Sequence, residues 1–138
     1  MSAVLRLMDL TEQMHATMPF TELIGATAVA AAPDEVVLRL KWDAKRCTSG
    51  GMLHGGALMS LADAAGGWCA FLNLPEGATG TATVTSATNF LRPVTSGVVE
   101  AVARPLNVGR AVIVLDTELQ VGERLVARVT QTQAVLRG

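Results

Sequence analysis

Residues 50–68 read GGMLHGGALMSLADAAGGW, and they hold the residue types best suited to chemistry in this 138-residue chain. The single carboxylate of the stretch, Asp63, lies among small apolar residues that favour a helix. A helix that begins near Gly55 leaves its first N–H groups without internal partners, and its dipole gives that end partial positive charge. Gly55 and Gly56 carry no side chain to block a ligand, so this end is suited to stabilise an anion or a developing oxyanion. His54 directly precedes it and could shape the loop through its ring nitrogens.

The spacing of Gly55 and Asp63 is too large for one helix to present both to a small reacting group. Eight residues of helix rise by roughly 12 Å, whereas one reacting atom must lie about 3 Å from each group. Two antiparallel copies of the helix, side by side across a twofold axis, would bring each N-terminus near the Asp63 of the other chain. The spacing therefore predicts a composite site at a homodimer interface, with two equivalent sites per dimer. Two non-catalytic interpretations stay open: Asp63 points into solvent, or it bonds a buried hydroxyl for structure alone.

Other reaction chemistries find little support in the residues. The only mid-chain histidine is His54, and no Ser-His-Asp order, G-x-S-x-G elbow, Walker A motif or dinucleotide glycine motif is present. One His and one Asp are too few for a metal site, so none is expected. Cys47 and Cys69 are expected to be ordinary small thiols in a reducing cytoplasm. Five further carboxylates are expected to be solvated: Asp34, Asp43, Asp116, Glu118 and Glu123.

The composition argues against several classes of partner. The net charge is −1, no Lys/Arg cluster is present, and the aromatic residues are only three Phe and two Trp, so we expect no nucleic-acid binding. The first 20 residues mix charges with apolar residues, and no stretch approaches the roughly 20 apolar residues of a membrane span, so neither a targeting segment nor a membrane partner is expected. The 50% hydrophobic content with few aromatics predicts that apolar surface is buried against another subunit.

Hydrophobic spacing predicts the elements that position these groups. Apolar positions three or four apart predict a helix over residues 3–18, which Pro19 ends and on which His15 is expected to be solvated or loosely packed. Residues 55–72 predict a long helix that is apolar nearly all round and therefore buried on most sides. Alternation and turn residues predict a turn-rich segment at 43–53 and strands over 23–33, 34–42, 81–94, 97–106, 110–121 and 124–136. A buried helix among antiparallel strands predicts an α+β fold whose sheet curls over the helix.

The run G-M-L-H-G-G-A-L-M-S-L-A-D-A-A-G-G, followed some 25 residues later by N-F-L-R-P-V, resembles the hotdog-fold acyl-CoA thioesterases of the phenylacetic-acid-degradation type, the PaaI-like thioesterases. The likeness covers roughly residues 20–136. It implies one long central helix wrapped by a curved antiparallel sheet, in homodimers that pair into homotetramers. Residues 21–138 would be the hotdog thioesterase domain, with residues 1–20 as an extra N-terminal helix of the same single domain. The implied reaction is hydrolysis of an acyl-CoA thioester to a carboxylic acid and free CoA, with no cofactor beyond the CoA of the substrate.

The resemblance also implies roles for single residues. The backbone N–H of Gly55 would polarise the thioester carbonyl, and Asp63 of the neighbouring subunit would act as general base or nucleophile. Thr83 would help hold the water or the carboxylate, and His54 would support the loop at the helix start. Family members often carry Asn or Gln six residues before this His, where Thr48 stands here with a shorter reach and a different donor pattern.

The substrate-binding residues are less sharply indicated. The acyl group would enter between helix and sheet beside Leu53, Met59 and Trp68, each of which could equally be plain core. The CoA phosphates would need cations, for which Arg92, Arg110 and Lys45 are candidates, and each could equally be a solvated turn cation. Gly56 and Asn89 complete the expected substrate contacts. Three other functions stay open: a hotdog domain that binds acyl-CoA without turnover, a hydratase or dehydratase on the same fold, and a structural oligomer.

Overall fold

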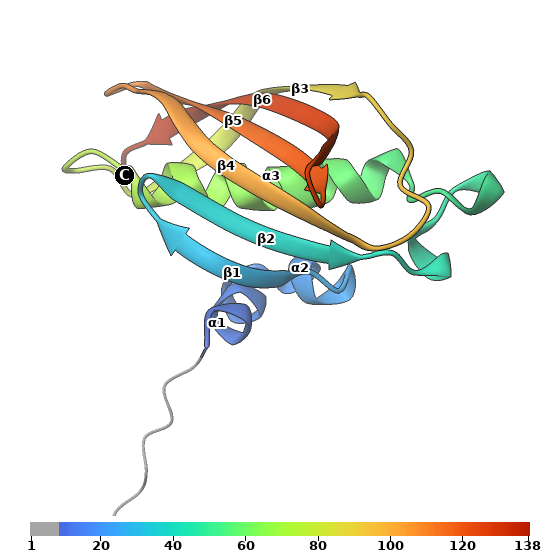
Figure 1. Ribbon diagram of the computed structural model, residues 1–138. Helices are drawn as coiled ribbons and strands as arrows, with labels where there is room; N and C mark the ends of the chain where they lie inside the picture. The colour runs from blue at the N-terminus through green and yellow to red at the C-terminus, as the bar shows by residue number, and fades with distance from the viewer. Residues whose placement is uncertain (1–8) are drawn as a thin grey trace, which may run out of the picture.

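A long helix lying against a curved sheet organises the chain, as the computed structural model shows for residues 9–138 (Figure 1). In chain order the elements are α1 (Leu10–Thr17), α2 (Pro19–Leu23), β1 (Thr27–Ala32), β2 (Glu35–Lys41), the short 3₁₀ helices η1 (Ala44–Arg46) and η2 (Ser49–Gly51), α3 (Gly55–Leu72), β3 (Gly80–Phe90), β4 (Val98–Val108), β5 (Val112–Val121) and β6 (Arg124–Leu136).

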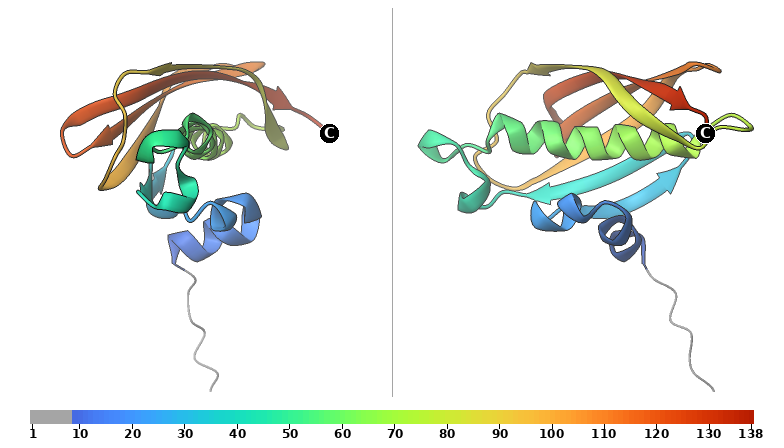
Figure 2. Two further views of the ribbon diagram at one scale, coloured as in Figure 1. Left: turned by 90° about the vertical axis from the view of Figure 1, so that its right-hand side faces the viewer. Right: turned by 180° about the vertical axis from the view of Figure 1, so that it is seen from behind.

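The strands form one six-stranded antiparallel sheet in the order β1-β2-β4-β5-β6-β3. The sheet arches over α3, and α1 and α2 lie beside β1 (Figure 2). The helix and the arched sheet confirm the predicted α+β hotdog architecture. Because β1 and β3 are the outermost strands, each carries one unpaired edge, and the edge of β3 lies on the side of the sheet that holds the site described below.

The contact between α3 and the sheet builds the core. The inward face of α3 is apolar and buried at Leu58, Leu61, Ala62, Ala65 and Cys69. Opposite these side chains lie buried residues of the strands, among them Leu38, Ala101, Leu115 and Val129. The alanines favour the helix and let it approach the strands closely, so this face is fixed beneath the sheet.

Side-chain hydrogen bonds fix both ends of α3. His54 is the N-cap, and its ring accepts the N–H of Gly56. At the other end, Asn73 Nδ2 donates to the carbonyls of Cys69 at 2.8 Å and of Pro33 at 2.6 Å. The second bond ties the end of α3 to the turn between β1 and β2. The axial position of α3 under the sheet is therefore defined at both ends.

The N-terminal region differs from the predicted single helix over residues 3–18. Its first six residues lie outside the described part of the chain, and the rest forms α1, followed at once by α2. Pro19 does end the first helix, but it is also the first residue of α2, where a missing N–H and a fixed φ are tolerated. His15, expected to be solvated or loosely packed, is partly buried: its side chain is 23% exposed, and Nε2 lies 2.7 Å from the carbonyl oxygen of Ala26. His15 thus fastens α1 to the segment that enters β1.

The strand predicted over residues 81–94 ends earlier, at Phe90. The N–H groups of Leu91 and Arg92 both donate to the carbonyl of Val126, at 2.8 and 3.1 Å, and Pro93 has no N–H to continue the ladder. Within residues 9–138, none of the helices combines the length and apolar character needed to cross a membrane.

Candidate active site

The start of α3 is shaped by His54. Its Nδ1 accepts the N–H of Gly56 at 2.8 Å, so the ring proton of a neutral His54 sits on Nε2. The backbone N–H of His54 donates to the carbonyl of Arg46 at 2.9 Å, and its own carbonyl accepts the N–H of Ala57 at 2.9 Å. His54 therefore anchors the loop to η1 and accepts the N–H groups of Gly56 and Ala57, which follow Gly55.

The N–H of Gly55 has no acceptor within the part of the chain that the structure describes. It lies at the positive end of the α3 dipole, so it is available to an external carbonyl oxygen or anion. A Cβ at this position would lie 3.0 Å from Cζ of Phe90, which is closer than ordinary packing allows. A side chain at residue 55 would therefore require the exposed ring of Phe90 to shift.

A cavity of about 280 Å³ opens at the start of α3. Four predicted site residues line it together: Thr48, Leu53, Gly55 and Arg92. Arg92 is exposed, and its guanidinium has no acidic partner among residues 9–138. The structure thus brings the predicted carbonyl-polarising N–H and one predicted phosphate-binding cation to the same hollow.

Asp63 lies on the outward side of α3 and is held by the sheet through one carboxylate oxygen. Its Oδ1 accepts from Nε2 of Gln131 at 3.0 Å and, at a long 3.4 Å, from Oγ1 of Thr83. Nε2 of Gln133 donates to the same Thr83 hydroxyl at 2.6 Å. No donor from the described residues reaches Oδ2 of Asp63. The predicted pairing of Asp63 with Thr83 is present, and the carboxylate keeps one oxygen for an outside group.

Sequence reasoning missed Gln131 and Gln133. Both are almost fully buried, at 1% and 2% exposure, on the face of β6 that meets α3. The signal was the run T-Q-T-Q in a strand whose inward positions, such as Ala127 and Val129, are otherwise apolar. Polar residues at two successive inward positions of a strand need partners, and the carboxylate of Asp63 and the hydroxyl of Thr83 supply them.

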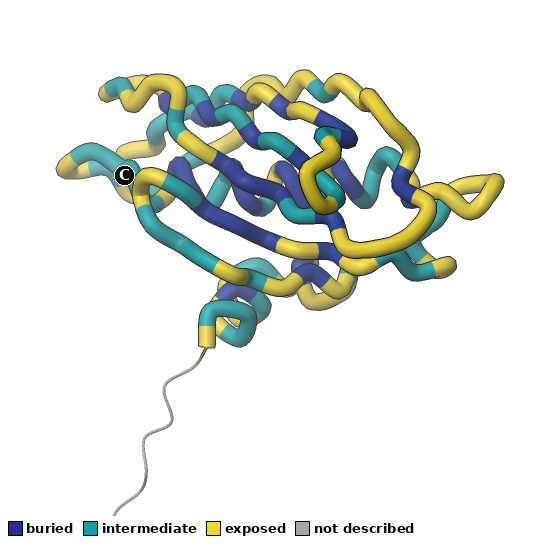
Figure 3. The backbone as a smooth tube through the Cα atoms, in the orientation of Figure 1, coloured by how far each residue is buried: buried dark blue, intermediate teal, exposed yellow. Residues whose placement is uncertain are grey.

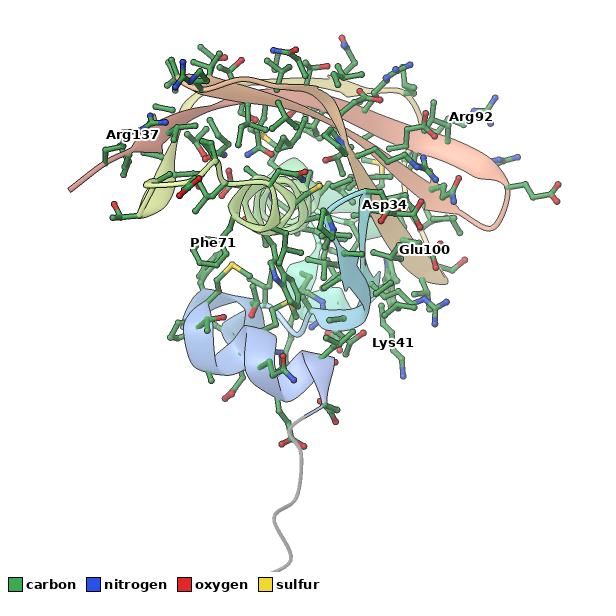
Figure 4. The ribbon with its side chains drawn as sticks, turned by 90° about the vertical axis from the view of Figure 1, so that its left-hand side faces the viewer. Asp34, Lys41, Phe71, Arg92, Glu100 and Arg137 are labelled. Atoms are coloured by element: carbon green, nitrogen blue, oxygen red, sulfur yellow. The ribbon has the colours of Figure 1, made fainter. Side chains whose placement is uncertain are left out.

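The larger cavity, about 920 Å³, opens beside Asp63. Its lining includes the predicted residues Asp63, Thr83, Met59 and Trp68, together with Gln133 from β6 and Met18, Phe20 and Phe71. Figure 4 shows Phe71 extending from α3 on the side of α1 and α2. Among the described residues that line the cavity, Asp63 is the only charged one. The arrangement offers an apolar chamber with a single carboxylate at its wall.

Four predicted binding residues lie outside both cavities: Asn89, Arg110, Gly56 and Lys45. Asn89 pairs with Arg128, whose side chain binds Asp116 at 3.0 Å, so Asn89 lies on the outer face of the sheet, away from α3. Arg110 lies in the turn between β4 and β5, at the opposite end of the sheet from the start of α3 (Figure 1). Gly56 lines a third hollow, of about 350 Å³, together with His54 and Lys45.

Asp63 and the N–H of Gly55 thus face different cavities of the same protomer. Eight residues of α3 separate them, roughly 12 Å of helix rise. Beside Asp63, β3 is exposed along most of its 11 residues, in contrast to β2 and β4 (Figure 3). Within one protomer the two groups cannot meet on one thioester, as the spacing predicted.

Other nucleophiles and metal ligands do not gather elsewhere. Burial, together with the nearby negative charge of Asp34, raises the pKa of Cys69 to about 11, so this thiol stays protonated and unreactive near neutrality. Among residues 9–138, no three His, Cys, Asp or Glu side chains form a group that could hold a metal ion. Asp63 is therefore the one reactive side chain that the described residues place at a large cavity.

Comparisons with known proteins agree with this fold. The family model described as Thioesterase superfamily matches residues 50–129. A relative named "Putative esterase" from Haemophilus influenzae is 34% identical over 100 residues, which are 72% of each chain. A solved thioesterase from Haemophilus influenzae is 27% identical, with a TM-score of 0.85 over 96% of this chain and 93% of that one. A mutant of the phenylacetic acid degradation protein PaaI from Thermus thermophilus is 29% identical, with a TM-score of 0.79 over 86% of this chain and 99% of that one. The chain belongs to the thioesterase superfamily, as a hotdog-fold, PaaI-like member whose general activity is thioester hydrolysis.

Proposed function

We propose that the protein hydrolyses acyl-CoA thioesters in composite sites, each built from the Gly55 N–H of one protomer and Asp63 of the partner subunit. One observation carries the proposal: Gly55, with its free N–H, and Asp63, whose Oδ2 has no donor among residues 9–138, line different cavities of one chain. A second copy is the simplest way to bring them together. The proposed unit is a homodimer, and a pair of dimers forms the proposed homotetramer.

The exposed edge of β3 supports this assembly. A strand of 11 residues with an unpaired edge invites pairing with a second strand, which covers its free N–H and C=O groups. Antiparallel pairing of two β3 edges joins the two sheets and sets two α3 helices side by side in opposite directions. In that arrangement the start of each α3 lies toward the partner's Asp63.

The proposed reaction needs three events at the thioester. The Gly55 N–H donates to the carbonyl oxygen and stabilises the negative charge that develops there. Oδ2 of Asp63 removes a proton from water as the water oxygen attacks the carbonyl carbon, or it attacks that carbon itself and water then cleaves the anhydride. In the first route the C–S bond of the tetrahedral intermediate breaks and the protonated Asp63 gives its proton to the sulfur. In the second route the C–S bond breaks as the anhydride forms, and the CoA thiolate takes a proton from the water that cleaves the anhydride. Both routes yield the carboxylic acid and free CoA.

The substrate is proposed to lie along both cavities. The apolar 920 Å³ cavity takes the acyl chain, and Arg92 at the smaller cavity takes a phosphate of CoA. The position of Arg92 favours it over Arg110. No further cofactor is proposed, and the two free cysteines suit action in a reducing cytoplasm.

Thiol release over a panel of acyl-CoAs, with the parent and the Asp63→Asn variant, tests the function. We expect turnover of at least one apolar acyl-CoA, and a loss of roughly 10²- to 10⁴-fold in kcat for Asp63→Asn, since this removes the proton acceptor or nucleophile. Calorimetric binding of the same acyl-CoA to the variant should persist. Binding without turnover by the parent would identify a non-catalytic acyl-CoA receptor, and near-normal kcat for Asp63→Asn would remove Asp63 from the mechanism.

A further inference from the structure

Gln131 has a buried side-chain amide whose nitrogen is hydrogen-bonded and whose oxygen is not. The side chain lies on β6 beneath α3 with 1% of its surface exposed. Its Nε2 donates to Oδ1 of Asp63 at 3.0 Å, but its Oε1 is buried without any partner. An unpaired buried carbonyl oxygen is unfavourable, so this side chain is not explained by stability. The direction of the amide follows from its partner, because an ionised carboxylate can only accept hydrogen bonds.

Gly66 makes this position of the amide possible. Gly66 is buried in the middle of α3, one turn after Asp63, and a Cβ there would overlap Oε1 and Cδ of Gln131. A glycine inside a helix is itself unfavourable, because it gives up more backbone freedom than alanine. The neighbouring Gly67 has no such contact. Two features are therefore unfavourable for stability: the glycine within α3 and the unpaired Oε1 of Gln131. Together they allow the Nε2–H of Gln131 to reach Asp63.

The remaining contacts act on the same oxygen. Thr83 donates to Oδ1 of Asp63, and Gln133 fixes the Thr83 hydroxyl from the side by donating to it at 2.6 Å. Both donors to the carboxylate therefore hold Oδ1. Oδ2 has no donor from residues 9–138, and Asp63 lines the 920 Å³ cavity.

We propose that Gln131 is a positioning residue: through the space left by Gly66 it holds Oδ1 of Asp63, which fixes Oδ2 as the reacting oxygen. The inference rests on the proposed catalytic role of Asp63. Gln131 does not touch the substrate in this arrangement, so its loss affects the chemical step and leaves substrate binding nearly intact.

Gln131→Met tests the proposal, since methionine has a similar length and volume and no N–H. We expect kcat to fall by roughly 10- to 100-fold from misplacement of the carboxylate, with KM changed by less than about twofold. We also expect the melting temperature to stay the same or to rise, because the orphan carbonyl is gone. Retention of kcat within about twofold would overturn the proposal. A lower melting temperature together with a rise in KM as large as the fall in kcat would also overturn it, because that pattern indicates a structural role.

Gly66→Ala supplies a second and independent variant. Its methyl group displaces the Gln131 amide, so it should lower kcat about as much as Gln131→Ala does, and the double variant should be no slower than the single ones. If the fold-losses in kcat multiply in the double variant, Gly66 and Gln131 act independently, which would contradict the proposal. Asp63→Asn distinguishes the catalytic role of Asp63 from the positioning role of Gln131. If Asp63→Asn inactivates the enzyme while Gln131→Met does not, only the positioning role fails. If Asp63→Asn stays active, the proposed function fails first.

Discussion

Mixing two differently damaged chains tests the composite site directly. One chain carries Asp63→Asn and the other Gly55→Val. A Cβ at residue 55 would already lie 3.0 Å from Cζ of Phe90, so the valine must displace that ring and stand over the free N–H. If each site takes Gly55 from one protomer and Asp63 from the other, a mixed dimer holds one site with both groups intact and one site with both groups damaged.

The expected recovery follows from counting sites. Loss of a general base costs roughly 10²- to 10⁴-fold and loss of an oxyanion donor roughly 10²- to 10³-fold, so each variant alone should keep about 1% of parental activity or less. Random assembly of equal amounts makes half of the dimers mixed, and each of these has one working site in two. The mixture should therefore regain about one quarter of the parental activity. A site built within one chain predicts no recovery, because every chain in the mixture is damaged.

Subunit exchange by reversible unfolding, followed by a thiol-release assay, gives the measurement. A matched control places both substitutions on the same chain and mixes it with the unmodified chain in equal amounts. Composite sites then work only in unmodified dimers and leave about one quarter of the activity, whereas single-chain sites leave about one half. No recovery of activity in the mixture, together with one half of the parental activity in the control, would refute the cross-subunit arrangement.

Two further predictions concern stability. Gly67→Ala should raise the free energy of unfolding by about 1 kcal/mol in urea denaturation, because its Cβ meets nothing within 4 Å and alanine favours a helix; no gain, or a loss, would show that α3 is strained there. The raised pKa of Cys69, about 11, means that the thiol contribution is complete below pH 9 and is lost as the pH rises through 11. Stability should then fall by up to about 3 kcal/mol more in the parent than in Cys69→Ala, and equal alkaline losses in the two proteins would contradict this explanation.

The sequence alone could locate the long helix, the six strands along the chain and the separation of Gly55 from Asp63, because each follows from a local rule. It did not predict the order of the strands within the sheet. Helix rise is fixed by backbone geometry, so an eight-residue spacing has a definite length once residues 55–72 are helical. The contacts of Asp63 were harder to predict. Thr83 and Gln131 reach it from two strands that are far apart in sequence, and Gln133 reaches the Thr83 hydroxyl, so these contacts depend on sheet register.

Asn89 shows how a single irregularity changes a prediction. In a regular strand, Thr83 and Asn89 are six residues apart and share a face. The pairing of β3 with β6 shifts between Thr83 and Thr85, and the extra residue reverses the alternation from there on. Ser86 therefore faces α3 opposite the buried Gln131, whereas Asn89 faces outward beside Arg128. No turn or composition signal in T-A-T-V-T-S marks this bulge, so the sequence could not reveal which face Asn89 occupies.

The same sheet edge links assembly to the proposed chemistry. Asp63 bonds to Thr83 on β3, the last strand of the sheet, so the carboxylate lies beside the unpaired edge of the sheet. A second chain that pairs with β3 must place its own elements beside Asp63, because nothing in the described sheet lies beyond this strand. The exposed strand, the single carboxylate at the apolar cavity and the distant Gly55 N–H then have one common explanation. Dimer formation would cover the strand and complete the site in the same step, so a separated protomer would hold a well-positioned base with no polarised carbonyl to act on.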